Sequence, residues 1–443
     1  MTAQPDMTAQ RVAPPRWALL HALAAGRDFE SYLRRRAATG DPFAVGFPGF
    51  PPVLFTGTPE GARELFRAPI PLVTPPRPNP IEPMVGAASL ILSSGERHRA
   101  DRAMLAPALH GPRVRALGET IRDTTVEALE TACGPGTSGP IDALVLSRTI
   151  TRRVILTAVF GSADHRDHEY AGAVTAFLDA FTTPLLVAPV LRRGLAGFGP
   201  WDRFTTARAR LDELLLTDIA RRRAAGPGTG DLLDLLLSIR YDDGTALTDT
   251  DLCDQLRTLI VAGHETTATT LTWALYHLHR EPGLLSRTTA ELAGADPLDG
   301  TDLLDAVCQE TLRLHPPVPI VLRTLTAPWR WRGLDLAAGQ TIGLAVGVLH
   351  SRPATWPAPR LFHPDRFLDR PIPPFAFAPF GGGHRRCVGA TLADYELRVV
   401  LATLLTTVRL RPTPALTFGR RPRSVPRNLA SAPDRAIQFT PAQ

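Results

Sequence analysis

The sequence predicts a mainly α-helical protein with a minor β part, and three observations support this prediction. Apolar residues recur at helical spacing through most of the middle of the chain. One long segment, from Thr248 to Glu281, begins with a helix-capping pattern and stops before Pro282. Strand-like runs are short and lie near the N-terminus and at 326–346. The other central and C-terminal helices are expected at 113–132, 142–160, 166–182, 201–224, 230–240 and 388–407.

The N-terminal elements follow from local patterns. Residues 1–12 are mostly polar and show no periodicity, so we expect a disordered tail. Phe29 to Ala38 has the pattern of a helix, and Phe43 to Phe47 and Pro52 to Thr56 have that of two strands joined by a Gly/Pro turn. Pro69 to Pro83 is rich in proline and almost uncharged, which predicts a long ordered loop.

The bulk composition is that of an ordinary globular protein, with 44 % hydrophobic and 21 % charged residues and no internal repeat, so we expect one domain over 13–443. The net charge is +6, but no dense basic run with interleaved aromatic residues occurs, so nucleic-acid binding is not predicted. The apolar stretch from Trp17 to Ala25 is far shorter than the roughly 20 residues of a membrane helix, and we expect an amphipathic helix and no membrane anchor. The 4 scattered cysteines favour a reducing, cytoplasmic location over a disulfide scaffold.

The glycine-rich segment from Pro379 to Gly389 carries the most informative functional signal. Its Cys387 ends the loop and is expected to begin a helix, where the helix dipole and free backbone N–H groups favour a thiolate. The glycines allow the main chain to turn tightly and to lie close to a flat object. These conditions suit an anionic sulfur ligand to a large planar cofactor. The alternative is a structural cysteine, because most free cysteines are small core residues.

The segment also matches a known signature. The four fixed positions of the heme-binding pattern FxxGxxxCxG are occupied by Phe380, Gly383, Cys387 and Gly389, so the chain resembles the cytochrome P450 superfamily. The resemblance implies heme b as the cofactor, Cys387 as the thiolate ligand of its iron, and a heme contact for Phe380 and Gly389. It also implies that Arg385, two residues before the cysteine, binds a heme propionate.

A second family element is the ExxR pattern, which here runs from Glu310 to Arg313. Residues three apart lie on one helix face and can pair. The segment from Phe362 to Phe367 resembles the region whose arginine, Arg366 here, joins that pair. The resemblance therefore gives Glu310, Arg313 and Arg366 a structural role behind the heme. The alternative is separate surface ion pairs, worth about 0–1 kcal/mol each.

Glycine and polar residues interrupt the long helix between Ala262 and Thr267. A threonine hydroxyl can bond to the carbonyl four residues earlier and bend a helix, so a tolerated kink is one interpretation. The stretch resembles the family's acid–alcohol motif, with Glu265 and Thr266 relaying the protons needed to break the O–O bond. An unpaired buried glutamate is costly without a purpose, which favours this function. We expect Ala262 to contact the heme and His264 to be structural.

Basic residues elsewhere are expected to bind heme propionates. His98 and Arg102 are one helical turn apart in a segment that resembles the family's heme-edge helix, although many members have tryptophan in place of His98. Arg323, shortly after Pro317, matches a further propionate-binding arginine. Several guanidinium groups are well suited to binding two carboxylates. The alternative for each arginine is a solvated side chain.

The resemblance implies the cytochrome P450 fold, a mostly α triangular prism with heme between the long helix and the helix after the cysteine. It also implies a monooxygenase that inserts one oxygen atom from O2 into a C–H bond. No flavin or nicotinamide module is recognisable, so we expect electrons from a ferredoxin and a ferredoxin reductase, with Arg386 on the face that meets the acidic donor. The alternatives are a peroxide-using or non-oxygenating heme-thiolate enzyme and a heme-based sensor, although a sensor needs an output domain.

The substrate is expected to be a hydrophobic small molecule, such as a terpenoid, fatty acid or polyketide of secondary metabolism. The walls should come from the loop at 73–93, the segment 175–200 and the long helix, all apolar and poor in charge. Core packing is the alternative for every wall residue. The expected pocket residues are Leu259, Val318, Ile320, Val321 and Leu429.

Overall fold

The computed structural model describes residues 24–25, 28–46, 51–134, 139–161, 167–195, 197–226, 231–418, 422–427 and 430–441. The predicted tail at 1–12, the apolar stretch before Ala24 and the predicted pocket residue Leu429 lie outside the described residues.

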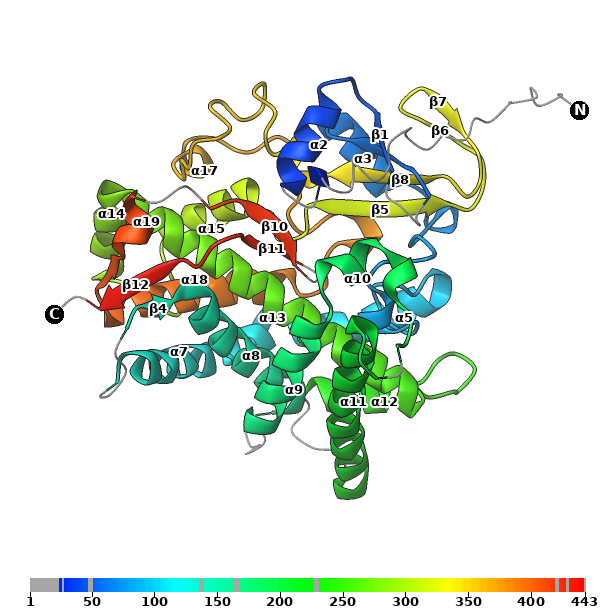
Figure 1. Cartoon of the computed structure of the whole chain (residues 1–443), viewed down its shortest axis with the longest axis horizontal. Coiled ribbons are helices and arrows are strands. Elements are labelled where there is room, and N and C mark those ends of the chain that lie inside the picture. The colour runs from blue at the N-terminus through cyan, green and yellow to red at the C-terminus, as the bar shows by residue number, and fades with distance from the viewer. Residues whose placement is uncertain are drawn as a thin grey trace, which may run out of the picture.

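The described chain is mainly helical, which confirms the predicted fold class. A long helix, α13 (Asp249–Arg280), crosses the molecule with other helices around it, as Figure 1 shows. The hydroxyl of Thr248 caps its first turn and the carboxylate of Asp251 accepts the Thr248 backbone N–H, so the predicted capping pattern is confirmed. The other long helices are α2 (Phe29–Ala37), α3 (Pro59–Arg67), α5 (Gly95–Leu105), α7 (Gly118–Cys133), α8 (Ala143–Phe160), α9 (Asp167–Ala180), α11 (Pro200–Ala225), α14 (Pro282–Leu292), α15 (Asp302–Leu314) and α18 (Ala390–Thr407).

Some predicted helix boundaries are wrong. The helix expected at 113–132 is divided at Leu117 into α6 (Gly111–Ala116) and α7. Helix α3 was not predicted, although Thr58 accepts a hydrogen bond from the third residue and Pro59 stands at the first position, which suits proline. The remaining short helices are α4 (Glu82–Val85), α10 (Thr183–Val187), α12 (Leu232–Ser238), α16 (Val346–Leu349), α17 (Arg366–Asp369) and α19 (Pro414–Phe418).

The main sheet has five strands in the order β1-β2-β8-β5-β3 and lies beside α2 and α3 (Figure 1). Only the β2–β8 pairing is parallel. The strand region expected at 326–346 is wrong at its start, because β5 begins at Ile320 and ends at Leu325. The strands of this sheet are β1 (Phe43–Val45), β2 (Val53–Thr56), β3 (Val73–Thr74), β5 (Ile320–Leu325) and β8 (Thr341–Ala345).

The remaining strands form three small sheets, ordered β4-β12-β9, β6-β7 and β10-β11. The hairpin β10–β11 lies across α13 in Figure 1, and α13 contacts β11. These strands are β4 (Ile141–Asp142), β6 (Trp329–Trp331), β7 (Leu334–Leu336), β9 (Leu410–Pro412), β10 (Ser424–Arg427), β11 (Ala430–Pro433) and β12 (Gln438–Pro441).

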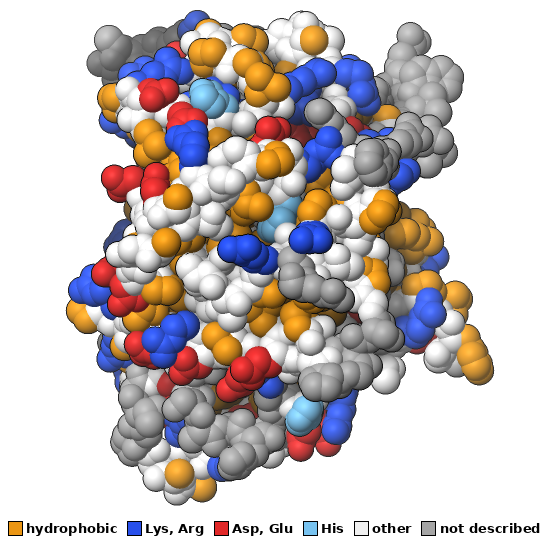
Figure 2. All heavy atoms as spheres, turned by 90° about the vertical axis from the view of Figure 1, so that its left-hand side faces the viewer, with side chains coloured by type: hydrophobic (Ala, Val, Ile, Leu, Met, Phe, Trp, Pro, Cys, Tyr) orange, Lys and Arg blue, Asp and Glu red, His pale blue; other side chains and the backbone are white. Residues whose placement is uncertain are grey.

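The largest hydrophobic core surrounds α13, which packs mainly against α8 and also against α11, α15 and α18. Almost every residue of α13 is buried, including polar ones, so its sequence lacks the one-sided apolar pattern of a surface helix. Within the described residues, no helix combines the length and the apolar character that a membrane span requires. On the face drawn in Figure 2, basic and acidic side chains are interspersed, and no broad region carries a single charge.

Candidate active site

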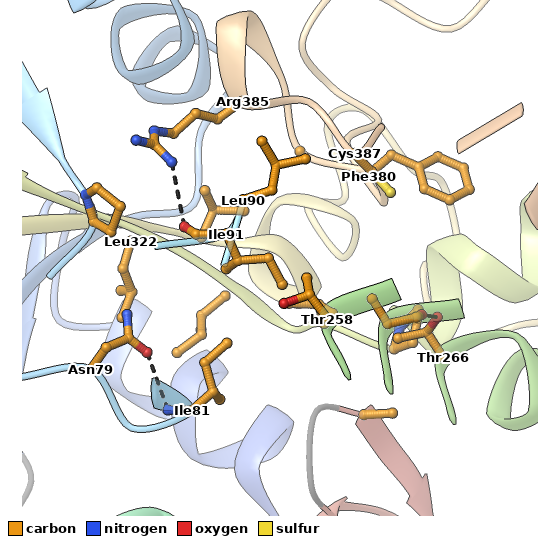
Figure 3. A pocket seen from close by; sticks show the side chains of 18 of the residues that line it. Asn79, Ile81, Leu90, Ile91, Thr258, Thr266, Leu322, Phe380, Arg385 and Cys387 are labelled. Carbon is orange, nitrogen blue, oxygen red and sulfur yellow. Dashed lines mark hydrogen bonds between the residues drawn. The ribbon is translucent and has the colours of Figure 1, made fainter. Parts of the chain in front are cut away.

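A cavity of about 610 Å³ lies between α13 and the loop that leads into α18. Figure 3 shows Cys387 and Phe380 on one side of it and Thr258 and Thr266 of α13 on another. Residues predicted from separate parts of the sequence therefore come together around one space. The predicted residues that line it are His98, Arg102, Leu259, Ala262, Thr266, Val318, Ile320, Val321, Arg323, Phe380, Arg385, Cys387 and Gly389.

The side chain of Cys387 faces this cavity, and protein atoms surround the thiol on its other sides. This burial raises the pKa of the thiol, and a backbone N–H of Gly389 and the charges of Arg386 and Arg102 oppose the rise. The expectation that Cys387 begins a helix is wrong, because α18 starts at Ala390 with Gly389 as its N-cap. The sulfur nevertheless lies beside a free backbone N–H just before the helix, which stabilises a thiolate.

Two glycines show how closely the cysteine loop is fitted to its surroundings. Gly383 has φ of +67°, and a Cβ there would lie 2.1 Å from the carbonyl oxygen of Phe66 on α3. A Cβ at Gly389 would instead meet nothing within 4 Å, because this residue faces the cavity. The first glycine is therefore required by packing and φ, and the second leaves room for a flat group beside Cys387.

Three arginines bring positive charge to one edge of the cavity. Arg102 donates to the carbonyl oxygen of Arg386 at 2.6 Å, and Arg385 donates to that of Ser93 at 2.5 Å and to that of Ile91 at 3.4 Å (Figure 3). Arg323 donates to the carbonyl oxygen of Leu322, at 2.7 Å. Among the described residues, no carboxylate pairs with any of these three guanidinium groups.

The electrostatics of this edge follow from burial and mutual repulsion. Burial, then repulsion from Arg385, lowers the pKa of Arg323 to about 9, and burial, then Arg102, lowers that of Arg385 to about 10. Burial and the arginine charges lower the pKa of His98 to about 3, so this imidazole is neutral. The Nε atom of Arg385 is buried and has no acceptor among the described residues. Such a cluster fits an anionic ligand, and the two propionates of heme supply the matching charge.

Thr266 lines the cavity from the middle of α13, and its hydroxyl donates to the carbonyl oxygen of Ala262 at 2.6 Å. The predicted hydrogen bond to the fourth preceding carbonyl is therefore present. The glycine in this stretch has a packing role, because a Cβ at Gly263 would lie 2.8 Å from Ile155 on α8. The close approach of α8 therefore explains this glycine, and a local opening of the helix is not needed to explain it.

Glu265 points away from the cavity. Its carboxylate is fully buried and accepts two hydrogen bonds from Arg148 on α8, at 2.6 and 3.0 Å. The expectation of an unpaired buried glutamate is wrong, because Arg148 pairs with it. Arg148 lies more than a hundred positions earlier in the sequence, so no local pattern indicates this partner. The neighbouring His264 accepts or donates a hydrogen bond with Thr151 at 2.8 Å, and burial lowers its pKa to about 3.

Glu310, Arg313 and Arg366 form one buried cluster on the far side of the cysteine loop. Arg313 contacts both oxygens of Glu310, at 2.6 and 2.8 Å, and Nε of Arg366 donates to Oε1 of Glu310 at 3.1 Å. Both arginines also donate to backbone carbonyls in the segment 350–361. This geometry matches the predicted scaffold and not the alternative of separate surface ion pairs.

Polar side chains of α13 hold the cavity wall at 84–91, and these residues were not predicted from the sequence. Asp254 accepts the backbone N–H of Ala88 at 3.0 Å, and Gln255 accepts that of Leu90 at 3.1 Å. The Thr258 hydroxyl lies 2.7 Å from that of Ser89. No sequence pattern links these residues to a loop about 165 positions away. The signal that could have indicated them is the unusual number of polar residues in a buried helix.

A cysteine facing a cavity with room for a flat group, beside a cationic edge, defines a heme-thiolate protein. The cytochrome P450 family model matches residues 11–430. Putative cytochrome P450 135B1 of Mycobacterium tuberculosis is 36 % identical over 349 residues, which is 77 % of this chain and 72 % of that protein. Putative cytochrome P450 137 of the same species is 32 % identical over 78 % of this chain and 72 % of its own.

Solved structures agree on the fold. A retinoic acid-bound cyanobacterial CYP120A1 has a TM-score of 0.81 at 24 % identity, covering 93 % of this chain and 94 % of that one. The heme domain of cytochrome P450DA has a TM-score of 0.80 at 23 % identity, covering 98 % and 97 %. The chain belongs to the cytochrome P450 family, whose members are heme enzymes of the oxygen-incorporating monooxygenase type.

Proposed function

We propose that this cytochrome P450 oxygenates a hydrophobic small molecule, with electrons from a separate ferredoxin and ferredoxin reductase. The observation that carries the proposal is that the cavity beside Cys387 continues from its cationic edge into apolar walls. Those walls include Leu259, Val318, Ile320 and Val321, as expected for an apolar substrate. The kinds of substrate named from the sequence, including compounds of secondary metabolism, stay within this proposal.

Bound heme supplies the iron at which O2 is activated. The chain holds it through the Cys387 sulfur, which the Gly389 N–H stabilises as a thiolate. Arg102, Arg323 and Arg385 would bind the propionates, and the neutral His98 ring could donate a further hydrogen bond. Phe380, Ala262 and Gly389, which also line the cavity, would contact the heme ring, so the chain would hold the group both by charge and by shape.

Protons reach the cavity through Thr266 in this proposal. Its Oγ1 can receive a proton from water and pass one on, while its bond to the Ala262 carbonyl fixes its orientation. Glu265 can supply the proton only when its carboxylate turns away from Arg148, since both of its oxygens are engaged. Arg148 is then a positioning residue that holds the acid outside the cavity between turnovers.

Turnover with 18O2 tests this function. The purified holoenzyme is supplied with a ferredoxin, its reductase and NADPH, and apolar organic compounds are screened for products. We expect one 18O atom in the product and dependence on both electron-transfer proteins. The proposal is wrong if every product forms equally well without them.

A second candidate is a heme-thiolate enzyme driven by peroxide, and one observation favours it. Glu265 is not among the described residues that line the cavity, so the acid of the acid–alcohol pair is not in place for proton delivery. Peroxide already carries the protons and electrons that the first candidate must import. Turnover with hydrogen peroxide alone, at a rate matching or exceeding the reconstituted system, would select this candidate.

A further inference from the structure

One charged side chain of the cavity lies apart from the heme-binding region. Seven of the eight titratable residues among the described lining belong to the cysteine loop, α5, α18 and β5: His98, Arg102, Arg323, Arg385, Arg386, Cys387 and Glu396. The eighth is Arg77, on the loop between β3 and α4. The lining residues next to it in the chain are Pro75, Pro76, Pro78, Asn79, Pro80 and Ile81. Among the described residues, Arg77 is therefore the one cationic group that lines the cavity from this loop.

Arg77 has no partner within the described part of the chain. Its side chain is exposed, and no carboxylate, carbonyl or hydroxyl there lies within hydrogen-bonding distance of its guanidinium group. Most other arginines on the cavity donate to a carbonyl oxygen, as Arg102, Arg323 and Arg385 do. The five donors of Arg77 are available to a ligand that enters the cavity.

The loop that carries Arg77 is held in place. Residues 75, 76, 78 and 80 are all prolines, each of which fixes its own φ. Asn79 accepts the backbone N–H of Ile81 at 3.1 Å, so its oxygen serves the loop itself (Figure 3). Arg192 donates to the carbonyl oxygen of Pro80 at 2.8 Å and to that of Leu185 at 2.9 Å, which ties the loop to α10. A fixed backbone lowers the entropy that a ligand contact at Arg77 would cost.

The charges around the cavity also favour an anion. Glu396 is the one carboxyl group among the described lining residues, and burial raises its pKa well above the ordinary value. Two propionates match the three heme-edge arginines only in part, and Arg77 adds a further positive charge in the apolar part. A neutral apolar substrate would leave that guanidinium to water, whereas a substrate with a terminal carboxylate would pair with it.

We infer that the substrate is an apolar carboxylic acid, with its carboxylate bound by Arg77 and its hydrocarbon part directed toward Thr266 and Cys387. This inference rests on the proposed function and adds the substrate class. Arg77 is the residue that selects acids over neutral molecules of the same shape. Because the pair lies at an exposed position, its contribution is modest, about twofold to fivefold in affinity.

Ligand titrations of the ferric holoenzyme test the inference. Dodecanoic acid, dodecan-1-ol and methyl dodecanoate have the same chain and differ at the end group. Binding is followed by the shift of the heme absorption band at pH 7.5 and low salt, where the acid is ionised. We expect the acid to bind about twofold to fivefold tighter than the alcohol or the ester, and added salt to reduce the difference.

Two substitutions separate the guanidinium from general effects. Arg77→Gln should bring the affinity for the acid to that of the alcohol and leave the alcohol unchanged, and Arg77→Lys should retain part of the preference. The control is Arg330→Gln, at an exposed arginine of β6 that is not among the described lining residues. It should change no affinity.

Three outcomes would overturn the inference. The first is equal binding of all three ligands by the wild type, the second is a preference for the acid that persists in Arg77→Gln, and the third is the absence of a shift in the heme band with every ligand. The 18O2 turnover assay on the same preparation distinguishes these outcomes from failure of the proposed function, because the enzyme can oxygenate a neutral compound without any preference for acids.

Discussion

Arg148 on α8 binds both carboxylate oxygens of Glu265 on α13, and this pair joins the helix that lines the cavity to the helix behind it. The glutamate is fully buried, while the Arg148 side chain is 24 % exposed. The pair therefore has two roles in this structure. It neutralises a buried charge, and it orients an acid whose place in the sequence suggests proton delivery.

Removing Arg148 should destabilise the protein. Arg148→Ala leaves the Glu265 carboxylate buried without its partner, and breaking such a pair costs several kcal/mol. Because Arg148 is partly exposed, we expect a loss of about 2–3 kcal/mol in the free energy of unfolding. The control is Arg153→Ala on the same helix, whose pair with Glu127 is at the surface and should contribute about 0–1 kcal/mol. Equal losses in chemical denaturation for both variants would contradict the prediction.

Replacing Cys387 should abolish thiolate ligation. In Cys387→Ser the alcohol cannot supply an anionic sulfur to the iron, so the reduced protein with carbon monoxide should lack the red-shifted band of thiolate-bound heme. Absorption spectra of the reduced carbon monoxide complex provide the measurement. Cys308→Ser, at a buried cysteine outside the cavity lining, should keep the band. Survival of the band in Cys387→Ser would refute the role of this residue.

The Thr266 hydroxyl should control how reducing equivalents are used. Thr266→Ala keeps the heme contacts but removes the hydroxyl that faces the cavity, so more electrons should end in hydrogen peroxide and fewer in product. Peroxide formed per NADPH consumed is the measurement, and we expect an increase of roughly an order of magnitude. Thr270→Ala removes a hydroxyl of the same helix, one turn on, that is not among the described lining groups. Tight coupling in Thr266→Ala would exclude the relay.

Acid should destabilise the fold through His350. Its ring bonds to the carbonyl oxygen of Arg313 at 3.2 Å and accepts the backbone N–H of Ala378 at 2.9 Å, and burial lowers its pKa to about 3. The unfolded chain takes up a proton near pH 6.5 and the folded one does not, so stability is lost as pH falls from about 6.5 toward 3. Between pH 6.5 and 5 this histidine accounts for about 2 kcal/mol.

His350→Gln tests this pH dependence, because glutamine can still accept the Ala378 N–H and does not titrate. Denaturation at pH 6.5 and pH 5 should show a stability loss about 2 kcal/mol smaller in the variant than in the wild type. Parallel losses in the two proteins would show that His350 is already protonated when folded.

The cysteine loop should be sensitive to a single methyl group. Gly383→Ala places a Cβ 2.1 Å from a backbone oxygen at a φ of +67°, so the loop must move and heme binding should weaken. Gly333→Ala has a similar φ of +77° but no atom within 4 Å of the added Cβ. Heme content per chain should fall by roughly half or more in the first variant and stay near that of the wild type in the second. Equal heme content would mean that the loop adapts.

The sequence predicted the features that depend on local patterns. The cap at Thr248, the positions of α8 and α11, and the set of residues around Cys387 all follow from short motifs or periodicity. The partner of Glu265, the contacts of Asp254 and Gln255, and the packing reason for Gly263 depend on tertiary neighbours. Local patterns contain no information on such distant pairs, so the charge state and direction of Glu265 could not be predicted.

The buried cluster of Glu310, Arg313 and Arg366 determines what a substitution within it would change first. The arginines hold the irregular segment at 350–361 by its carbonyl oxygens, where a sheet would hold it by a ladder of backbone bonds. That segment leads into the loop that carries the cysteine. A substitution of Arg366, which is not among the described lining residues, would therefore resemble a failure of cofactor loading during biogenesis, and the isolated protein would be colourless and inactive for lack of heme.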